Sequence, residues 1–581
     1  MVNQLSWKVG GQQGEGIDST GEIFAIALNR MGYYLYSYRH FSSRIKGGHT
    51  NNKIRVSTKQ IRSVSDDLDI LVAFDQETID VNAHELQANG IIIADSKFKP
   101  EKPEGIQASM YVVPFTEIAS DLGTTLMKNM VAIGATSAVL GLDPDAYLEV
   151  VQEIFGRKGD QIVEKNMEAI RAGYEYFNQE AGGQFNAFQL DKADGKRRLF
   201  MIGNDAIALG ALSAGARFMA AYPITPASEI MEYLIRKLPE VGGTVIQTED
   251  EIAAATMAIG ANYAGVRAFT ASAGPGLSLM MEAIGLAGMT ETPLVIVDTQ
   301  RGGPSTGLPT KQEQSDLMAM IYGTHGEIPK IVMAPSTAEE AFYDAIQAFN
   351  LAEKYQCPVI LLSDLQLSLG KQTVEPLDYN KIVIDRGNLD LNVQLPELEN
   401  KDYFKRYELT ENGISPRVVP GLKNGIHHVT GVEHDETGKP SEVSINRHIQ
   451  MDKRLRKLND VVANFDTPVY KNAPHEQADL LMVGFVSTRG VIEECVDWLE
   501  ADGIKVNHAH IRLIHPFPTE ELKRMIDQAK NVVVVENNAT GQLANIIKLN
   551  VGCAEKIHSV LKYDGNPFLP AEVYKKSKEL L

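Results

Sequence analysis

Three short segments bring acidic, basic and hydroxyl side chains together along the chain. YPITPASE (222–229) is predicted to turn from a strand into a helix, with Thr225 held between two prolines. QTEDEIAAATMAIGA (247–261) places acidic residues at the start of a helix of small residues. QRGGPSTGLPT (300–310) puts Arg301 in a glycine-rich loop directly after an apolar strand. Such a set offers a buried carboxylate and a guanidinium among hydroxyl groups, which suits the binding of an anionic ligand.

The acidic segment supplies a carboxylate of the kind that activates thiamine diphosphate. That cofactor reacts after losing the proton on C2 of its thiazolium ring, and its own 4′-imino group is the base. A buried glutamate bonded to N1′ of the aminopyrimidine favours this imino form. Glu251 stands at the strand-to-helix transition, and the small residues after it let a flat ring approach. Two alternatives stay open: the acids are simply favourable charges at a helix N-terminus, or Glu249 is the working residue.

Arg301 and its neighbours are suited to a 2-oxoacid, which carries a carboxylate beside its reacting carbonyl. A guanidinium grips a carboxylate with two parallel hydrogen bonds. Thr225 could bond a carboxylate or a carbonyl, and the arginine loop adds the hydroxyls of Ser305, Thr306 and Thr310. The alternatives are an arginine that only caps its loop and a threonine that caps the helix after it.

The N-terminal glycine loop GGQQGEG (10–16) follows a predicted strand and precedes a predicted helix. It does not fit GxGxxG, and the second predicted strand ends without an acidic residue, so the NAD fingerprint fails. A strand–loop–helix of this kind can still hold a phosphate at the helix N-terminus. The candidate residues for an anionic ligand or cofactor are Gly11, Gly14, Gly16 and, in SSRIKGGHT (42–50), Arg44. A purely structural role is the alternative for both segments.

Alternating strand and helix patterns predict an α/β fold of three domains. The first covers 1–190. The second covers 197–370, begins with a strand at 199–202 and contains a parallel sheet. An extended connection follows at 371–470, and a third α/β domain covers 471–581. Ligands bind beyond the carboxyl ends of strands in parallel sheets, and all three chemistry-bearing segments are predicted to lie at such ends.

Composition argues against several classes of function. The chain has 581 residues, of which 44% are hydrophobic and 23% charged, and a net charge of −19 disfavours nucleic-acid binding. Its three cysteines are far apart and no CxxC occurs, so we expect no disulfide framework and no zinc or iron–sulfur ligands in this chain. No stretch of about 18 apolar residues predicts a membrane span. The first residues lack the basic and apolar regions of a signal peptide, and we expect a cytoplasmic protein.

A missing motif limits which part of a thiamine site this chain can supply. Thiamine enzymes hold the diphosphate through Mg²⁺ and a GDG motif followed by an asparagine. The sequence contains no GDG, and the nearest string, Gly159-Asp160-Gln161, lies in a helical stretch. A transketolase would need that motif in this chain. We therefore expect the chain to supply only the pyrimidine half of a thiamine site, with the diphosphate half coming from a partner.

YPITPAS (222–228) and RGGPSTGLPT (301–310) closely resemble the alpha subunits of 2-oxoacid:ferredoxin oxidoreductases, in the form with a gamma domain fused at the N-terminus. The resemblance covers essentially the whole chain, although GGQQGEG departs from the usual GGQG. It implies a gamma-like first domain, a pyrimidine-binding-type second domain and a third domain like the C-terminal domain of transketolase. It also implies that Glu251 contacts pyrimidine N1′ and that the substrate side includes Tyr222, Thr225, Arg301 and Thr310.

The resemblance also implies partners. A separate beta subunit would carry thiamine diphosphate, Mg²⁺ and a [4Fe–4S] cluster, in a heterodimer or a dimer of heterodimers. The implied reaction converts a 2-oxoacid, coenzyme A and oxidised ferredoxin into acyl-CoA, CO₂ and reduced ferredoxin. The fused gamma domain and the lack of a ferredoxin-like segment favour 2-oxoglutarate and succinyl-CoA. Pyruvate, a branched-chain 2-oxoacid, or a non-catalytic assembly role are the alternatives.

Overall fold

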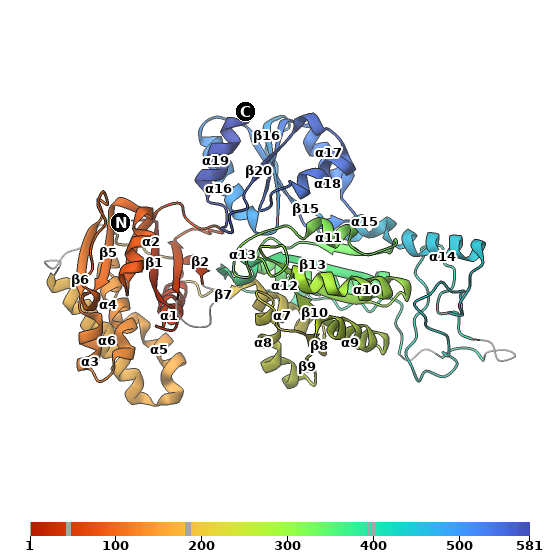
Figure 1. The fold of residues 1–581 in the computed structure, drawn as a ribbon, viewed down its shortest axis with the longest axis horizontal. Coiled ribbons are helices and arrows are strands. Elements are labelled where there is room, and N and C mark those ends of the chain that lie inside the picture. The colour runs from red at the N-terminus through yellow and green to blue at the C-terminus, as the bar shows by residue number, and fades with distance from the viewer. Residues whose placement is uncertain (1, 42–47, 181–187, 392–393, 398–402) are drawn as a thin grey trace. The chain divides into compact units, whose positions relative to one another are not determined.

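The computed structural model describes residues 2–41, 48–180, 188–391, 394–397 and 403–581 (Figure 1). The chain forms two compact units. The first unit contains Met1–Met201, Leu369–Pro376 and Leu569–Ala571, and the second contains Ile202–Ser368, Leu377–Phe568 and Glu572–Leu581. Three sheets of eight, seven and five strands run through the described residues, which confirms the predicted α/β class.

The eight-stranded sheet belongs to the first unit and has the order β6-β5-β4-β1-β3-β2-β14-β7. Parallel pairing joins β1, β4, β5 and β6, whereas β3 is antiparallel to both β1 and β2. The strands are β1 (Gln4–Gln12), β2 (Tyr34–His40), β3 (His49–Ser57), β4 (Leu68–Ala73), β5 (Leu86–Asp95), β6 (Ser109–Val113), β7 (Leu199–Ile202) and β14 (Lys371–Val374).

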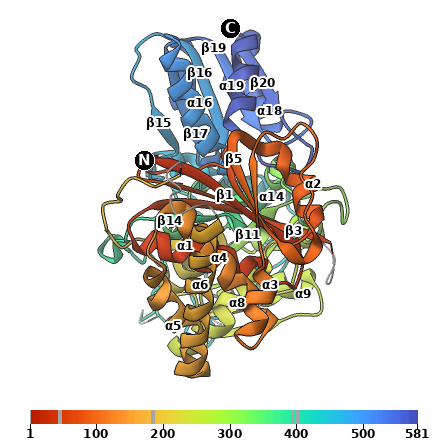
Figure 2. The same ribbon diagram turned by 90° about the vertical axis from the view of Figure 1, so that its left-hand side faces the viewer.

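Helices cover both faces of this sheet, because alternate strand residues are apolar on each side. Ile70 and Val72 face a core shared with α1 (Ile17–Arg30), α4 (Lys128–Leu140) and α6 (Asp160–Glu180), drawn together in Figure 2. Leu71 and Ala73 face α2 (Gln76–Asn82). Two shorter helices are α3 (Phe115–Asp121) and α5 (Leu148–Phe155). Gly134 lets α4 and α6 meet, since a Cβ there would lie 1.9 Å from the Ile170 carbonyl oxygen.

One strand prediction was wrong. The run at 199–202 was expected to open the second sheet, but β7 forms the edge of the first sheet beside β14. The Thr373 hydroxyl of β14 is bonded by the Leu35 N–H and by the Asn29 side chain, which fixes β14 against β2. A short apolar run carries no information about a pairing partner so far along the chain.

The seven-stranded sheet of the second unit has the order β18-β12-β13-β11-β10-β8-β9. All its neighbours are parallel except β18 on β12, so the predicted parallel sheet is confirmed. The strands are β8 (Phe218–Ala221), β9 (Thr244–Gln247), β10 (Ala268–Ser272), β11 (Leu294–Gln300), β12 (Ile331–Met333), β13 (Pro358–Asp364) and β18 (Leu513–His515).

Helices α7 to α12 pack around this sheet (Figure 1). Apolar residues of α9, α10 and α11 share one core with the central strands, while α7 and α12 pack together away from that core. The bounds are α7 (Gly203–Ser213), α8 (Ser228–Lys237), α9 (Glu251–Tyr263), α10 (Gly274–Met289), α11 (Leu317–Tyr322) and α12 (Ala338–Tyr355). The short helix α13 (Leu365–Leu369) follows β13.

The five-stranded sheet lies in the C-terminal part of the second unit, in the order β15-β17-β16-β19-β20. Its core with α17 and α18 is continuous with that of the seven-stranded sheet, whereas α16 and α19 cover the other face. The elements are β15 (Val469–Asn472), β16 (Ala478–Phe485), β17 (Val506–Ile511), β19 (Ala529–Glu536), β20 (Ile557–Leu561), α16 (Arg489–Ala501), α17 (Thr519–Asp527), α18 (Gln542–Val551) and α19 (Pro570–Glu579).

The segment between β14 and β15 is mostly irregular, with the helices α14 (Ser444–Arg456) and α15 (Val461–Asn464) near its end. Buried ion pairs hold it in place. Glu353 of α12 pairs with Arg386 and Arg417 of this segment, and Glu291 pairs with Lys453 and Lys457. Across the ranges that the structure describes, no helix is long and apolar enough to cross a membrane.

Candidate active site

The three chemistry-bearing segments meet at one edge of the seven-stranded sheet, as predicted. β8, β9, β10 and β11 are neighbours and run parallel, so their carboxyl ends lie side by side. The 222–227 turn leaves β8, α9 begins after β9, α10 begins after β10, and the arginine loop leaves β11. This is the edge at which ligands bind in parallel α/β sheets.

Glu251 is the buried acid of its segment. It is only 6% exposed, whereas Glu249 is exposed. The helix cap is Asp250, whose side chain accepts the Ala253 N–H at 2.7 Å, so Glu251 is not needed as a cap. The Glu251 side chain thus lies in the protein without being used by the helix end. A buried carboxylate that the helix end does not use can accept a hydrogen bond from a ligand that binds beside it.

Glu251 and Ser272 pack closely against Gly276 in the first turn of α10. A Cβ on Gly276 would come 2.7 Å from Glu251 Oε1 and 2.0 Å from Ser272 Oγ. Ala254 and Ala255 follow Glu251 on α9 and are fully buried. These small residues fit the edge of a flat ring, so the observed surroundings of Glu251 are compatible with an aminopyrimidine.

Arg301 links the two loops of the site. Its Nη1 donates to the Thr225 carbonyl at 2.6 Å and its Nη2 donates to the Thr306 carbonyl at 3.3 Å. The side chain is buried, with 7% of it exposed, and its Nε has no partner among the described residues. Burial lowers the pKa of Arg301, and the charge of Asp316 opposes that shift. Because both hydrogen-bond acceptors are neutral carbonyls, the guanidinium forms no direct ion pair among the described residues and can pair with an anionic ligand.

The other predicted substrate residues differ in their exposure. Thr225 and Thr310 are half-buried, and Tyr222 is 41% exposed. Thr225 does not cap α8, since the N-cap position is Ala227 and no side chain bonds there. The Thr225 hydroxyl therefore does not have the helix-capping role that was the alternative to substrate binding.

Sequence reasoning missed two acids beside this site, Asp298 and Asp316. Asp298 is fully buried near the end of β11, and burial raises its pKa well above the ordinary value, with the charge of Asp316 adding to the effect. Burial, together with the charge of Glu313, raises the pKa of Asp316 to about 6. The available signal was an aspartate inside the apolar run LVIVD, where a charged residue is exceptional.

The N-terminal glycines serve the fold of the first unit. Gly11 lies within β1 and pairs with Thr50 of β3. Gly14 and Gly16 have positive φ, and Gly16 is the N-cap residue of α1. Its carbonyl accepts the Asn129 side chain at 3.2 Å. The binding role predicted for these glycines remains a prediction, and Arg44 lies outside the described residues.

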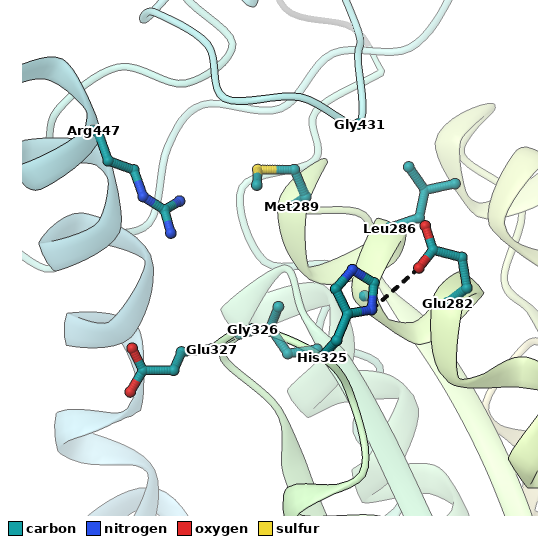
Figure 3. A pocket seen from close by; sticks show the side chains of 10 residues that line it. Glu282, Leu286, Met289, His325, Gly326, Glu327, Gly431 and Arg447 are labelled. Atoms are coloured by element: carbon teal, nitrogen blue, oxygen red, sulfur yellow. Dashed lines mark ion pairs between the residues drawn. The ribbon is translucent and has the colours of Figure 1, made fainter. Parts of the chain in front are cut away.

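A surface recess of about 200 Å³ lies away from the predicted residues (Figure 3). His325 and Glu282 form an exposed ion pair at its edge, opposite Arg447 of α14. Leu286 and Met289 of α10 line its base. None of Glu251, Arg301 or the threonines contributes to it. In the described part of the chain, no group of three or more His, Cys, Asp or Glu residues is arranged to hold a metal ion.

Comparison with known proteins shows the family of the chain. Residues 209–454 match the family model described as "Pyruvate flavodoxin/ferredoxin oxidoreductase, thiamine diP-bdg". Residues 6–176 match "Pyruvate ferredoxin/flavodoxin oxidoreductase", and residues 478–573 match "Pyruvate:ferredoxin oxidoreductase core domain II". The second unit therefore contains a thiamine diphosphate-binding domain, and its match spans Glu251 and Arg301.

Individual relatives are similar over most of their length. The 2-oxoacid:ferredoxin oxidoreductase subunit alpha of Sulfolobus sp. is 35% identical over 98% of this chain and 96% of its own. The 2-oxoglutarate synthase subunit KorA of Methanocaldococcus jannaschii is 39% identical over 64% of this chain and 97% of its own. A solved structure, 2-oxoglutarate:ferredoxin oxidoreductase from Magnetococcus marinus with 2-oxoglutarate, coenzyme A and succinyl-CoA bound, is 35% identical with a TM-score of 0.92 over 100% of both chains. The resemblance seen in the sequence is thus confirmed, and the chain belongs to the family of 2-oxoacid:ferredoxin oxidoreductase alpha subunits, oxidoreductases that work with a partner subunit.

Proposed function

We propose that this chain forms the pyrimidine and substrate side of a 2-oxoglutarate:ferredoxin oxidoreductase. With a beta subunit it would convert 2-oxoglutarate, coenzyme A and oxidised ferredoxin into succinyl-CoA, CO₂ and reduced ferredoxin. The observation that carries the proposal is a buried carboxylate that the helix end does not use, Glu251, at the same sheet edge as a buried cation, Arg301, whose hydrogen-bond acceptors are neutral.

Each residue has a defined task in this proposal. When bound, thiamine diphosphate supplies the carbanion that attacks the ketone of the substrate. Glu251 accepts a hydrogen bond from pyrimidine N1′ and so holds the proton at that atom. Arg301 binds the carboxylate next to the ketone, and the Thr225 and Thr310 hydroxyls orient the substrate. Tyr222 closes the outer side of the site.

The remaining parts are assigned to the beta subunit. This sequence has no GDG motif, and its three cysteines are scattered. Among the described residues Cys357 and Cys495 are buried and lie in different domains. The beta subunit would therefore hold the diphosphate with Mg²⁺, together with an iron–sulfur cluster that passes electrons to ferredoxin.

The substrate is inferred from relatives. The Magnetococcus marinus enzyme, similar over the full length of both chains, is named for 2-oxoglutarate and binds it with coenzyme A. The Sulfolobus relative is named only for 2-oxoacids, so pyruvate and branched-chain 2-oxoacids are the alternatives that an assay must separate.

The test uses the complex of this chain with its beta subunit, purified without oxygen. Reduction of a low-potential dye is followed with coenzyme A and either 2-oxoglutarate or pyruvate. Faster reduction with 2-oxoglutarate, dependent on coenzyme A, is the expected result. A preference for pyruvate would keep the reaction class and overturn the substrate. A complete complex that fails to reduce the dye with any 2-oxoacid would indicate an assembly role.

Arg301→Lys tests the substrate contact in the same assay. Lysine keeps the positive charge but lacks the planar fork that binds a carboxylate with two bonds. We expect KM for the 2-oxoacid to rise roughly 10- to 100-fold, with a smaller change in kcat. This rise corresponds to the loss of one charge-assisted hydrogen bond. Arg236→Lys, at an exposed position of α8, is the matched control and should leave KM unchanged. An unchanged KM in Arg301→Lys would contradict this role.

A further inference from the structure

A pair of acids beside Arg301 has no task in the proposed reaction. Asp298 lies next to Ser272 in the parallel register of β10 and β11. Both side chains are fully buried, and neither Asp298 oxygen nor Ser272 Oγ has a hydrogen-bond partner in the described part of the chain. A buried carboxyl group in such surroundings is stable only in its neutral form, which agrees with the raised pKa of Asp298.

Asp316 interacts electrostatically with both this acid and the substrate arginine. Its backbone N–H donates to the Gln300 side chain at 3.1 Å. Its carboxylate fills the space above Gly274, where an added Cβ would come 2.8 Å from both oxygens. One of these oxygens is buried without a partner among the described residues. Unlike Asp298, the residue keeps some exposure, so a proton can reach it from solvent.

The charged groups around Asp316 are few. Arg301 is the cation that lowers the pKa of Asp316, and Glu313 in the same loop and burial raise it. Asp298 faces it from β11, and its neutral form adds no charge. The other neighbours are neutral: Gly274 at the start of α10, Gln300 of β11 and Gln542 of α18, which bonds the Ser315 carbonyl.

Arg301 is balanced by Asp316 without being paired to it. The guanidinium donates to two carbonyl oxygens, and within the described ranges it forms no ion pair with a carboxylate. A ligand carboxylate arriving at Arg301 therefore brings a second negative charge next to Asp316 in a site with little water. Like charges in such a site cannot both stay ionised without a large penalty.

We propose that Asp316 takes up a proton when a 2-oxoacid binds, so that substrate affinity and the protonation of this residue are coupled. The inference rests on the proposed function of Arg301. The proton comes from solvent and forms one O–H bond on the Asp316 carboxylate, and no bond of the substrate breaks in this step. Neutral Asp298 adds no charge of its own to the site.

The coupling has a defined sign. Protonated Asp316 no longer competes for Arg301, so affinity for the 2-oxoacid is highest at low pH. Affinity then falls as the pH rises through about 6, the pKa of Asp316 in the free protein, and becomes constant above the higher pKa of the bound state. Linkage relates this change in affinity to the pKa of Asp316. Each tenfold difference in affinity between the protonated and the deprotonated form corresponds to a difference of about one unit between the pKa of Asp316 in the free protein and its pKa in the bound protein.

The test measures proton uptake directly. The oxygen-free complex is titrated with 2-hydroxyglutarate, which lacks the ketone and cannot react, in two buffers of different ionisation enthalpy near pH 7. The wild-type complex should take up a fraction of a proton for each ligand bound. Asp316→Asn should take up none, bind about three- to tenfold more tightly at pH 7.5, and show a KM for the 2-oxoacid that no longer varies with pH.

Asp298→Asn is the matched control, because asparagine has the shape of the neutral acid. It should keep the proton uptake. Uptake that persists in Asp316→Asn, or that disappears only in Asp298→Asn, would overturn the inference. A wild-type complex that binds the analogue and turns over normally but takes up no proton would overturn the inference alone. A wild-type complex that neither binds the analogue nor reduces the dye would overturn the proposed function, and the inference with it.

Discussion

Glu251 and Glu249 are two residues apart, yet the fold gives them different surroundings. Asp250 between them caps α9, which turns Glu251 into the protein beside Gly276 and leaves Glu249 exposed. Only the buried carboxylate can hold a proton on a ring that is itself removed from water. Replacing each glutamate in turn by the isosteric glutamine therefore tests which of the two contacts the pyrimidine.

Glu251→Gln is expected to lower kcat of the complex by roughly 10²- to 10⁴-fold, the range for losing a positioned proton-transfer group. Glutamine fills the same space, so assembly with the beta subunit should be unchanged in gel filtration. Glu249→Gln is the control, and its kcat should equal that of the wild type. The reverse pattern, with activity lost only in Glu249→Gln, would move the pyrimidine contact to Glu249.

At the scale of elements, the first turn of α10 is without side chains where two carboxylates approach it. Gly274 and Gly276 leave room there for the Asp316 and Glu251 carboxylates respectively. Gly285, further along the same helix, has no atom within 4 Å of where its Cβ would lie. The same substitution therefore has opposite consequences at two positions of one helix.

Gly276→Ala should raise the concentration of thiamine diphosphate needed for half-maximal activity by at least about tenfold, because a methyl group overlaps Ser272 and displaces Glu251. Gly285→Ala should leave that requirement unchanged and stabilise the helix by about 0.5–1 kcal/mol. Activity is measured on cofactor-depleted complex with added thiamine diphosphate. Equal cofactor requirements in the two variants would show that the ring does not bind beside Glu251.

Element prediction from sequence succeeded where local pattern is sufficient. The apolar strands of the parallel sheet and the loops after them follow from periodicity, and this alone brought Thr225, Glu251 and Arg301 to one edge. Two features depend on distant contacts and were not predicted. The pairing of β7 with β14 is set by residues far along the chain, and the burial of Asp298 requires the register between β10 and β11.

At the scale of the whole molecule, buried charges join the parts of the second unit. Arg489 and Arg512 of the C-terminal domain bond Glu340 and Asp344 of α12. The irregular segment before that domain is fixed to α12 in a similar way, since Glu353 accepts hydrogen bonds from several arginines. Such pairs add little to stability compared with apolar contacts, but removing one partner is costly because the other charges stay buried.

Glu353→Ala tests this arrangement. The carboxylate is 2% exposed and pairs with three arginines, namely Arg267, Arg386 and Arg417. Its loss leaves the buried charges of Arg267 and Arg417 without their carboxylate, so we expect a cost of about 3–5 kcal/mol. The irregular segment at 377–468 should then be cleaved faster by protease in the native complex, while KM for the 2-oxoacid stays constant. Glu240→Ala, which removes an exposed pair with Lys237, is the control and should change stability by less than about 1 kcal/mol. Equal thermal midpoints for the two variants would show that apolar packing alone holds the segment in place.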